Sequence, residues 1–229
     1  SMELGGNAPF IVLDDADIDE AVKGAMIAKL RNGGAACTAA NRFYVSKKVA
    51  AQFTEKLTAA MAEIKMASGL TEGAQLGASV SVKERNKIAD LVTASISQGA
   101  ELKLGGKTPD GDGAFYPPTV LTVAADNEIL QEEIFGPVAV IVTVDSDEQA
   151  ISLANDTEYG LISYIYSADL GRALKVAEAM ESGMVAINRG VISDPAAPFG
   201  GYKQSGLGRE GGFDGVHEFL EKKYIGAAF

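Results

Sequence analysis

The chain alternates short apolar runs with longer segments in which apolar residues recur every three or four positions. Residues 137–144 form a nearly continuous β-branched run, which is typical of a strand buried on both faces of a parallel sheet. The pattern predicts strands at residues 8–13, 41–46, 116–123, 137–144, 161–166 and 184–188, and helices at 18–30, 47–65, 82–98, 147–155 and 170–181. This order predicts an α/β fold with an open, twisted, mostly parallel sheet flanked by helices.

Polar and glycine residues mark where the first helix begins and ends. Asp17 can accept hydrogen bonds at its N-terminus, and Glu20 three residues later completes a capping-box pattern. The run Asn32-Gly33-Gly34 predicts the end of the helix, because glycine adopts the left-handed conformation that closes a last turn. Cys37 is therefore expected in a turn just beyond this helix.

The loops and the two ends complete the predicted organisation. Residues 105–113 are expected to form an exposed hairpin-like loop, and residues 190–212 a long functional loop. We interpret residues 1–2 as a cloning remnant and leave them out of the fold prediction. Residues 3–212 are expected to be one catalytic domain, and residues 213–229 a short helix followed by an edge strand near 222–225.

Composition narrows the class of protein. A length of 229 residues, with 47% hydrophobic and 22% charged residues, suits a soluble globular protein with a sizeable core. The net charge of −11 disfavours nucleic acid and anionic membranes as partners, and the sequence has no apolar run long enough for a membrane span. A single cysteine allows no internal disulfide, which fits a reducing cytoplasm.

That single cysteine, Cys37, is the first candidate for chemistry. Considered alone, a free cysteine is more often an inert buried residue, because a nucleophilic thiol needs a partner that manages its proton. Glu3 could serve as that base, since the glycines after it allow the backbone to approach a ligand closely. His217 could instead form a Cys–His dyad, although a lone histidine on a helix is more often structural.

Other polar residues leave two interpretations open. Arg31, in the last turn of the first helix, could compensate the helix dipole or offer a bidentate fork to a carboxylate. Glu133 and Phe135 could belong to a solvated turn. The glycine-rich loop at 198–210 could cradle phosphate, but it lacks the strand–GxxxxGK[ST]–helix order of a phosphate-binding loop. No cluster of His, Cys and Asp has metal-ligand spacing, so no metal site is predicted.

Five motifs in order resemble the aldehyde dehydrogenase family: ELGGN at 3–7, the glycine-rich turn ending in Cys37, EEIFGP at 132–137, NDTEYGL at 155–161, and PFGGYKQSGLGREGG at 198–212. The 34 positions from Glu3 to Cys37 also match the family's spacing between base and nucleophile. The resemblance implies that Cys37 attacks an aldehyde, that Glu3 activates water, and that the cofactor is NAD or NADP. It implies further that Glu133 holds the nicotinamide ribose and that Phe135 packs near the ring.

Two positions favour one group within the family, the succinate-semialdehyde dehydrogenases. Arg31 and Ser193 match an arginine and a serine with which those enzymes bind the distal carboxylate of the substrate. Two others depart from the pattern. Ala35 stands where many relatives carry glutamine, and Ala39 stands where some carry a second cysteine, so no Cys-x-Cys pair exists in this chain.

The chain is about half the usual length of this family, and the resemblance implies that the N-terminal dinucleotide-binding domain is missing. We therefore expect a catalytic half with a C-terminal oligomerisation strand, inactive by itself in hydride transfer and homo-oligomeric through the apolar surface that the missing half would expose. Two other functions stay open: a cofactor-independent thiol esterase that uses Cys37 and Glu3, and a non-catalytic assembly module.

Overall fold

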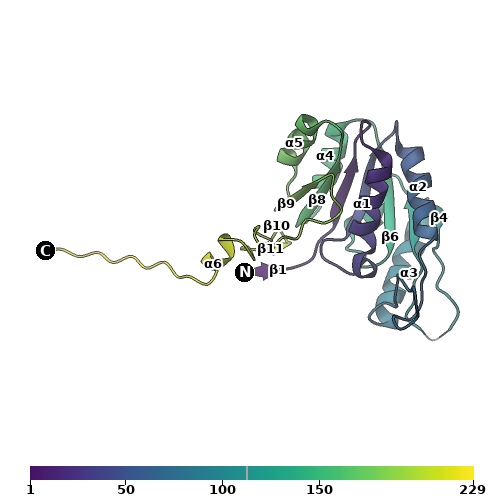
Figure 1. The fold of residues 1–229 in the computed structure, drawn as a ribbon, viewed down its shortest axis with the longest axis horizontal. Coiled ribbons are helices and arrows are strands. Elements are labelled where there is room, and N and C mark those ends of the chain that lie inside the picture. Colours follow the sequence, from purple (N-terminus) through teal and green to yellow (C-terminus); the bar gives the residue numbers. More distant parts are fainter. Residues whose placement is uncertain (112) are drawn as a thin grey trace.

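The computed structural model describes residues 1–111 and 113–229 and confirms the α/β prediction (Figure 1). The main strands are β2 (Ala8–Val12), β3 (Ala40–Ser46), β4 (Glu101–Leu104), β5 (Thr119–Thr122), β6 (Val138–Val144), β8 (Ile162–Tyr166) and β9 (Met184–Ile187). They form one sheet in the order β4-β5-β6-β3-β2-β8-β9. All neighbours are parallel except β4 and β5, so the sheet is mostly parallel as predicted.

Helices cover both faces of this sheet. They are α1 (Ile18–Leu30), α2 (Ala50–Ala62), α3 (Val82–Ser97), α4 (Asp147–Asn155) and α5 (Leu170–Ala179). Apolar residues of α1 and α2 share one buried cluster with Phe10 and Val12 of β2, whereas α3, α4 and α5 share a second cluster with Ile11 and Leu13. Successive residues of β2 thus point to opposite faces that are both buried, which explains why its sequence is apolar without alternation.

The predicted ends of α1 are confirmed in most respects. The Asp17 side chain accepts hydrogen bonds from the backbone N–H groups of Asp19 and Glu20. The Glu20 carboxylate accepts from Lys23 rather than from the Asp17 backbone, so only half of the capping box forms. At the other end a 3₁₀ turn (Arg31–Gly34) closes the helix, with Asn32, Gly33 and Gly34 at φ values of 53°, 64° and 78°.

Several boundaries differ from the prediction. Strand β4 was not predicted, and α2 begins and ends three residues inside the predicted limits. The loop at 105–113 joins the antiparallel strands β4 and β5 as a hairpin, and its residue 112 lies outside the described residues. Residues 222–225 form no strand, and the tail beyond α6 (Asp214–His217) extends away from the body (Figure 1). A strand there needs a pairing partner, and none of the described residues pairs with the tail.

The N-terminal residues belong to the fold, contrary to their exclusion from the prediction. Strand β1 (Met2–Glu3) pairs antiparallel with β11 (Gly206–Leu207), placing Met2 opposite Leu207. A second short pair joins β7 (Tyr159–Gly160) to β10 (Tyr202–Lys203). The end of the long loop at 190–212 is therefore fixed to the start of the chain. No helix in the described part of the chain is both long and apolar enough to cross a bilayer.

A buried polar network holds the amino ends of the central strands together. Lys29 of α1 is fully buried, and its Nζ donates to Asn41 Oδ1 at 2.7 Å and to the Gly136 carbonyl at 3.1 Å. Asn41 Nδ2 donates to Asn7 Oδ1 at 3.2 Å, and Asn7 Nδ2 donates to the Leu130 carbonyl at 2.9 Å. The network joins the end of α1, the starts of β2 and β3, and the segment that leads into β6.

Lys29 forms no ion pair with any of the described residues, and burial lowers its pKa to about 7. Its two acceptors match the two N–H groups of a neutral amine, whereas an ammonium group would have a third donor to satisfy. The unfolded chain holds this proton up to about pH 10.5, the usual lysine value. Between pH 7 and pH 10.5 the unfolded state therefore binds more protons, and the free energy of unfolding rises with pH.

We predict that Lys29→Met removes this dependence. The wild-type free energy of unfolding should gain up to about 1.4 kcal/mol per pH unit from this group as the pH rises above 7, and the variant should lack that gain. Urea unfolding at pH 7, 8 and 9 measures it. Lys23→Met, on the exposed face of the same helix, is the control and should keep the wild-type slope. Parallel curves for wild type and Lys29→Met would contradict the prediction.

Candidate functional site

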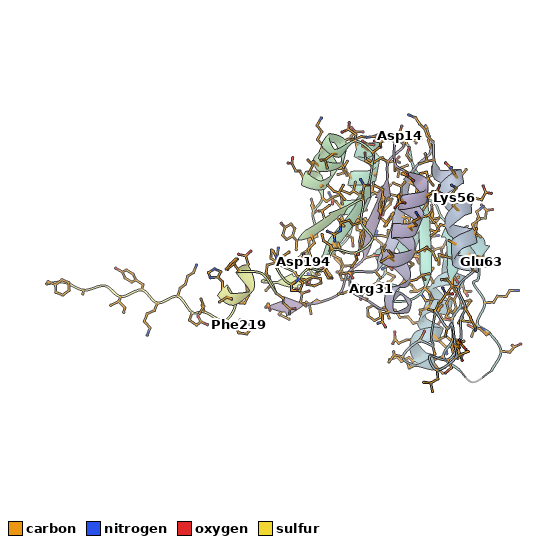
Figure 2. All side chains as sticks on the ribbon, viewed as in Figure 1. Asp14, Arg31, Lys56, Glu63, Asp194 and Phe219 are labelled. Atoms are coloured by element: carbon orange, nitrogen blue, oxygen red, sulfur yellow. The ribbon has the colours of Figure 1, made fainter. Side chains whose placement is uncertain are left out.

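The candidate residues gather at the amino ends of the parallel strands. Glu3, Cys37 and Glu133 precede β2, β3 and β6 respectively, and α1 runs back to deliver Arg31 to the same edge. Figure 2 shows Arg31 and Asp194 near one end of the strands, and Asp14, which follows β2, at the other end. Parallel sheets more often bind ligands at their carboxyl edge, so the sheet topology alone would have indicated the edge opposite to these candidate residues.

Close backbone contacts assemble the site. A Cβ atom on Gly6 would overlap the carbonyl oxygen of Cys37, so only glycine fits there. The backbone N–H of Gly6 donates to Glu133 Oε1 at 2.8 Å, and a Cβ on Gly5 would meet the other Glu133 oxygen at 3.1 Å. What approaches these glycines in the structure is protein: the Cys37 turn on one side and Glu133 on the other.

The Cys37 thiol is partly exposed, and its pKa is raised. Burial is the largest cause, followed by the negative charges of Glu3 and Glu133. A protonated thiol at neutral pH needs a group that takes its proton before it can act as a nucleophile. His217 does not fill this role in the structure, because it is exposed on α6 and is not among the groups that shift the thiol.

Glu3 is a carboxylate without a partner. Both its oxygens are shielded from solvent, and neither forms a hydrogen bond with the described residues. Burial and the charge of Glu210 raise its pKa, while Arg209 lowers it. A carboxylate in such surroundings accepts a proton more readily than an exposed one. Together with its effect on Cys37, this places a proton acceptor beside the only thiol of the chain.

Arg31 turns back toward the Cys37 turn. Its Nη2 donates to Thr38 Oγ1 at 3.1 Å, and the Tyr164 hydroxyl donates to the Thr38 carbonyl at 2.8 Å. The rest of the Arg31 side chain is exposed. Of the two interpretations of Arg31, the structure favours a guanidinium group that contacts Thr38, the residue after the cysteine, over one that only compensates the helix dipole.

Ser193 reaches the same edge from the other side. A Cβ on Gly190 would meet the backbone of Gly24 in the middle of α1. Ser193 shares a hollow with Met184, the first residue of β9, which places it at the amino edge of the sheet. Ser193 lines a hollow of about 200 Å³ with Gly183, Met184, Ile192, Asp194, Ala197, Pro198 and Phe199. Ser193 and Arg31 make no hydrogen bond with each other in the described structure.

Phe135 lies next to the glycine turn that precedes Cys37, where it shares a hollow with Gly33 and Ala35. It adopts a φ of 55°, which is rare for an aromatic residue, and its side chain is 40% exposed. It lines a hollow of about 430 Å³ whose wall also includes Ala35 and Tyr116. The buried Tyr116 hydroxyl has no hydrogen-bond partner among the described residues, and burial raises its pKa to about 12.

The glycine-rich loop does not present a phosphate cradle. Lys203 Nζ donates to the Asn155 and Thr157 carbonyls, and Arg209 Nη1 donates to the Gly201 and Gly208 carbonyls. Its backbone instead pairs with β1, placing Gly206 opposite Glu3. Within residues 1–111 and 113–229, no group of His, Cys, Asp and Glu side chains is arranged to hold a metal ion.

Four residues at this edge escaped the sequence analysis: Lys29, Thr38, Tyr116 and Tyr164. Tyr164 is indistinguishable from a core aromatic in an apolar strand, and Lys29 from a surface lysine at a helix end. Their roles depend on partners that lie up to 126 positions away in the sequence, which local patterns do not encode. Only Thr38 had a local signal, because it directly follows the candidate nucleophile.

Comparisons with known proteins identify the family of this chain. A family model described as the aldehyde dehydrogenase family matches residues 1–225. The chain is 54% identical over its whole length to a succinate-semialdehyde dehydrogenase of Paenarthrobacter nicotinovorans, covering 51% of that relative. It is 48% identical over 98% of its length to a glutarate-semialdehyde dehydrogenase of Pseudomonas putida, covering 47% of it.

A solved structure shows the same architecture. An NADP-dependent enzyme of E. coli superposes with a TM-score of 0.94 at 46% identity, over 97% of this chain and 47% of that one. The chain thus spans about half the length of the relatives it matches. Identity at this level over nearly every residue, together with the family match, is decisive: the chain belongs to the aldehyde dehydrogenase family.

Proposed function

We propose that this chain supplies the catalytic half of an NAD(P)-dependent aldehyde dehydrogenase that oxidises succinate semialdehyde to succinate. The observation that carries the proposal is that Cys37, Glu3 and Glu133 lie together at one edge of the sheet. The Arg31 guanidinium binds Thr38, the residue after Cys37. Two similar proteins are named for succinate and glutarate semialdehydes, and both of these aldehydes carry a distal carboxylate.

In the first step Cys37 acts as nucleophile. Glu3 takes the thiol proton, sulfur attacks the aldehyde carbon, and a tetrahedral thiohemiacetal forms on Cys37. The raised pKa of Glu3 suits it to this transfer, and the raised pKa of Cys37 makes the transfer necessary. The backbone N–H of Cys37 would donate to the developing oxyanion.

The residues on the Phe135 side fit the nicotinamide end of a dinucleotide. Glu133 is fixed by its hydrogen bond from Gly6, yet it keeps acceptor capacity for ribose hydroxyls, and Phe135 lines a hollow of about 430 Å³. Glu133 would hold the ribose, and Phe135 would pack near the ring. The bound nicotinamide supplies the hydride acceptor. NAD and NADP both satisfy this arrangement, and the similar E. coli structure is described as NADP-dependent.

Glu3 then acts a second time. Once the carbon is oxidised, Cys37 carries a thioester, and Glu3 has released the thiol proton to solvent. Glu3 then takes a proton from a water molecule that attacks the thioester carbon. The carbon–sulfur bond breaks, the acid leaves, and the Cys37 thiolate takes up the proton from Glu3, which restores the thiol. Arg31 and Ser193 would hold the distal carboxylate, which gives the preference for a semialdehyde of a dicarboxylic acid.

The chain alone is proposed to lack hydride transfer, because it spans about half of its relatives. The neighbouring Cys37 and Glu3 also support a second candidate function, hydrolysis of activated esters without a cofactor. Ester hydrolysis by the chain alone that disappears in Cys37→Ala would establish this second activity, and its absence would leave only the first.

We also propose that the chain is a homo-oligomer. Large apolar side chains are exposed along the extended tail: Phe213, Phe219, Leu220, Tyr224, Ile225 and Phe229. Such a tail buries its apolar side chains when it pairs with another chain. Light scattering should therefore give at least a dimer mass, and removal of residues 219–229 should reduce it. A monodisperse monomer of the intact chain would refute the proposal.

We predict that Arg31→Ala lowers kcat/KM for succinate semialdehyde by about 10- to 100-fold more than for butyraldehyde, since a charged hydrogen bond to the carboxylate is lost. Initial rates of NAD(P)H formation by the complete natural protein measure this. Lys23→Ala, on the same helix but remote from the edge, is the control. Equal losses for the two aldehydes would remove the basis for the succinate assignment.

We predict that Glu3→Gln has opposite effects on thiol ionisation and turnover. Removing the Glu3 charge should lower the pKa of Cys37 and move the iodoacetamide rate profile to lower pH. Turnover by the complete natural protein should nevertheless fall by about 100-fold or more, because the proton acceptor is lost. Glu20→Gln, an exposed carboxylate on α1, serves as control. Unchanged turnover in Glu3→Gln would exclude the assigned role.

A further inference from the structure

Thr38, the residue after Cys37, is held from two directions. Its hydroxyl accepts from Arg31 Nη2 at 3.1 Å, and its carbonyl accepts from the Tyr164 hydroxyl at 2.8 Å. The side chain is only 6% exposed. A hydroxyl buried to this degree and bonded to a cation is unusual in a turn, where threonine is normally solvated.

The Arg31 guanidinium depends on this one contact. Within the described residues, Thr38 is its only side-chain hydrogen-bond partner, and no carboxylate forms an ion pair with it. A guanidinium group has five N–H donors, so most of them remain free to bind an anion. Without the Thr38 hydroxyl, the exposed Arg31 side chain would populate many rotamers. Its positive charge would then spend less time at the residue next to Cys37.

Tyr164 fixes the position from which Thr38 acts. It lies on β8, and its ring stacks on Phe10 of the buried aromatic cluster, with ring centroids 5.8 Å apart. Its hydroxyl is buried and anchors the backbone of Thr38 to the sheet. Because its backbone is bound to Tyr164 of the core, the Thr38 hydroxyl is an acceptor with a fixed position.

We propose that Thr38 is a positioning residue that sets substrate preference: its hydroxyl holds the Arg31 guanidinium beside Cys37, so that the site favours electrophiles carrying a carboxylate. This inference rests on the proposed function, in which Arg31 receives the distal carboxylate of the aldehyde. Thr38 itself touches neither the substrate nor the cofactor. It acts by holding a charge in place.

The single cysteine provides a direct test that needs neither cofactor nor dehydrogenase activity. Iodoacetate and iodoacetamide form the same S–C bond to Cys37 with loss of iodide, but only iodoacetate carries a carboxylate. The ratio of their second-order rate constants, measured on the whole chain at one pH, reports the positive charge beside the thiol. A change in folding or thiol exposure alters both rates and largely cancels in the ratio.

Thr38→Val keeps the shape of the side chain and removes the acceptor, whereas Thr38→Ser keeps the hydroxyl. We expect the iodoacetate to iodoacetamide ratio to fall about three- to tenfold in Thr38→Val and in Arg31→Ala, as for loss of one charged hydrogen bond. It should stay within twofold of wild type in Thr38→Ser. Thr93→Val, an exposed threonine on α3, should also keep the wild-type ratio. The double variant Thr38→Val/Arg31→Ala should fall no further than either single variant.

Three results would overturn the inference: a wild-type ratio in Thr38→Val, a fall in Thr38→Ser equal to that in Thr38→Val, or additive falls in the double variant. If Thr38→Val does not fold, Thr38→Ala gives the same test. In the complete natural protein, Thr38→Val should lower kcat/KM for succinate semialdehyde more than for butyraldehyde. A complete protein that oxidises no aldehyde would refute the proposed function, while the alkylation ratio would still decide whether Thr38 positions Arg31.

Discussion

The contact between the Gly6 backbone and the Cys37 carbonyl is the constraint on which the rest of the site depends. No side chain fits between them, and the N–H of Gly6 is at the same time the donor that orients Glu133. The segments that precede β2, β3 and β6 are thereby fixed at one point. Glu3 lies three residues from this point, and β11 holds it there from the other side.

The Lys29 hydrogen-bond network also holds these segments together. It satisfies the polar groups of segments that cannot all pair within the sheet, because the strands begin there. A second close approach supports it, since a Cβ on Gly34 would overlap the carbonyl of Gly136, the residue that also accepts from Lys29. The cysteine turn is thus held by backbone packing and a buried amine.

The electrostatics of the site follow from this assembly. Burial and two carboxylates raise the pKa of the Cys37 thiol, so the fold does not store a ready thiolate. The same burial raises the pKa of Glu3 and makes it a suitable proton acceptor. The Arg31 guanidinium donates a hydrogen bond to Thr38, the residue that follows Cys37 in the sequence. Such a site suits a nucleophile that ionises only when an electrophile and a base are in place.

The sequence by itself determined the α/β class, most element positions and the motif residues. The central strands are apolar on both faces, and the Asn32-Gly33-Gly34 run could only end a helix, so local periodicity and backbone sterics were sufficient. Strand β4 escaped because its four residues are mostly exposed at an edge, where burial leaves no pattern. The place of Met2 in β1 escaped because its pairing partner is about 200 positions away.

Only the tertiary structure decided which edge of the sheet carries the site, what approaches the glycines, and how Thr38 and Tyr164 hold Arg31. Each of these depends on contacts between segments far apart in the chain. Hydrophobic periodicity reports whether a residue faces a core, and it contains no information about which distant residue it will meet there. The sequence therefore supplied the candidate reacting groups, and the fold alone set their burial, their contacts and their electrostatic surroundings.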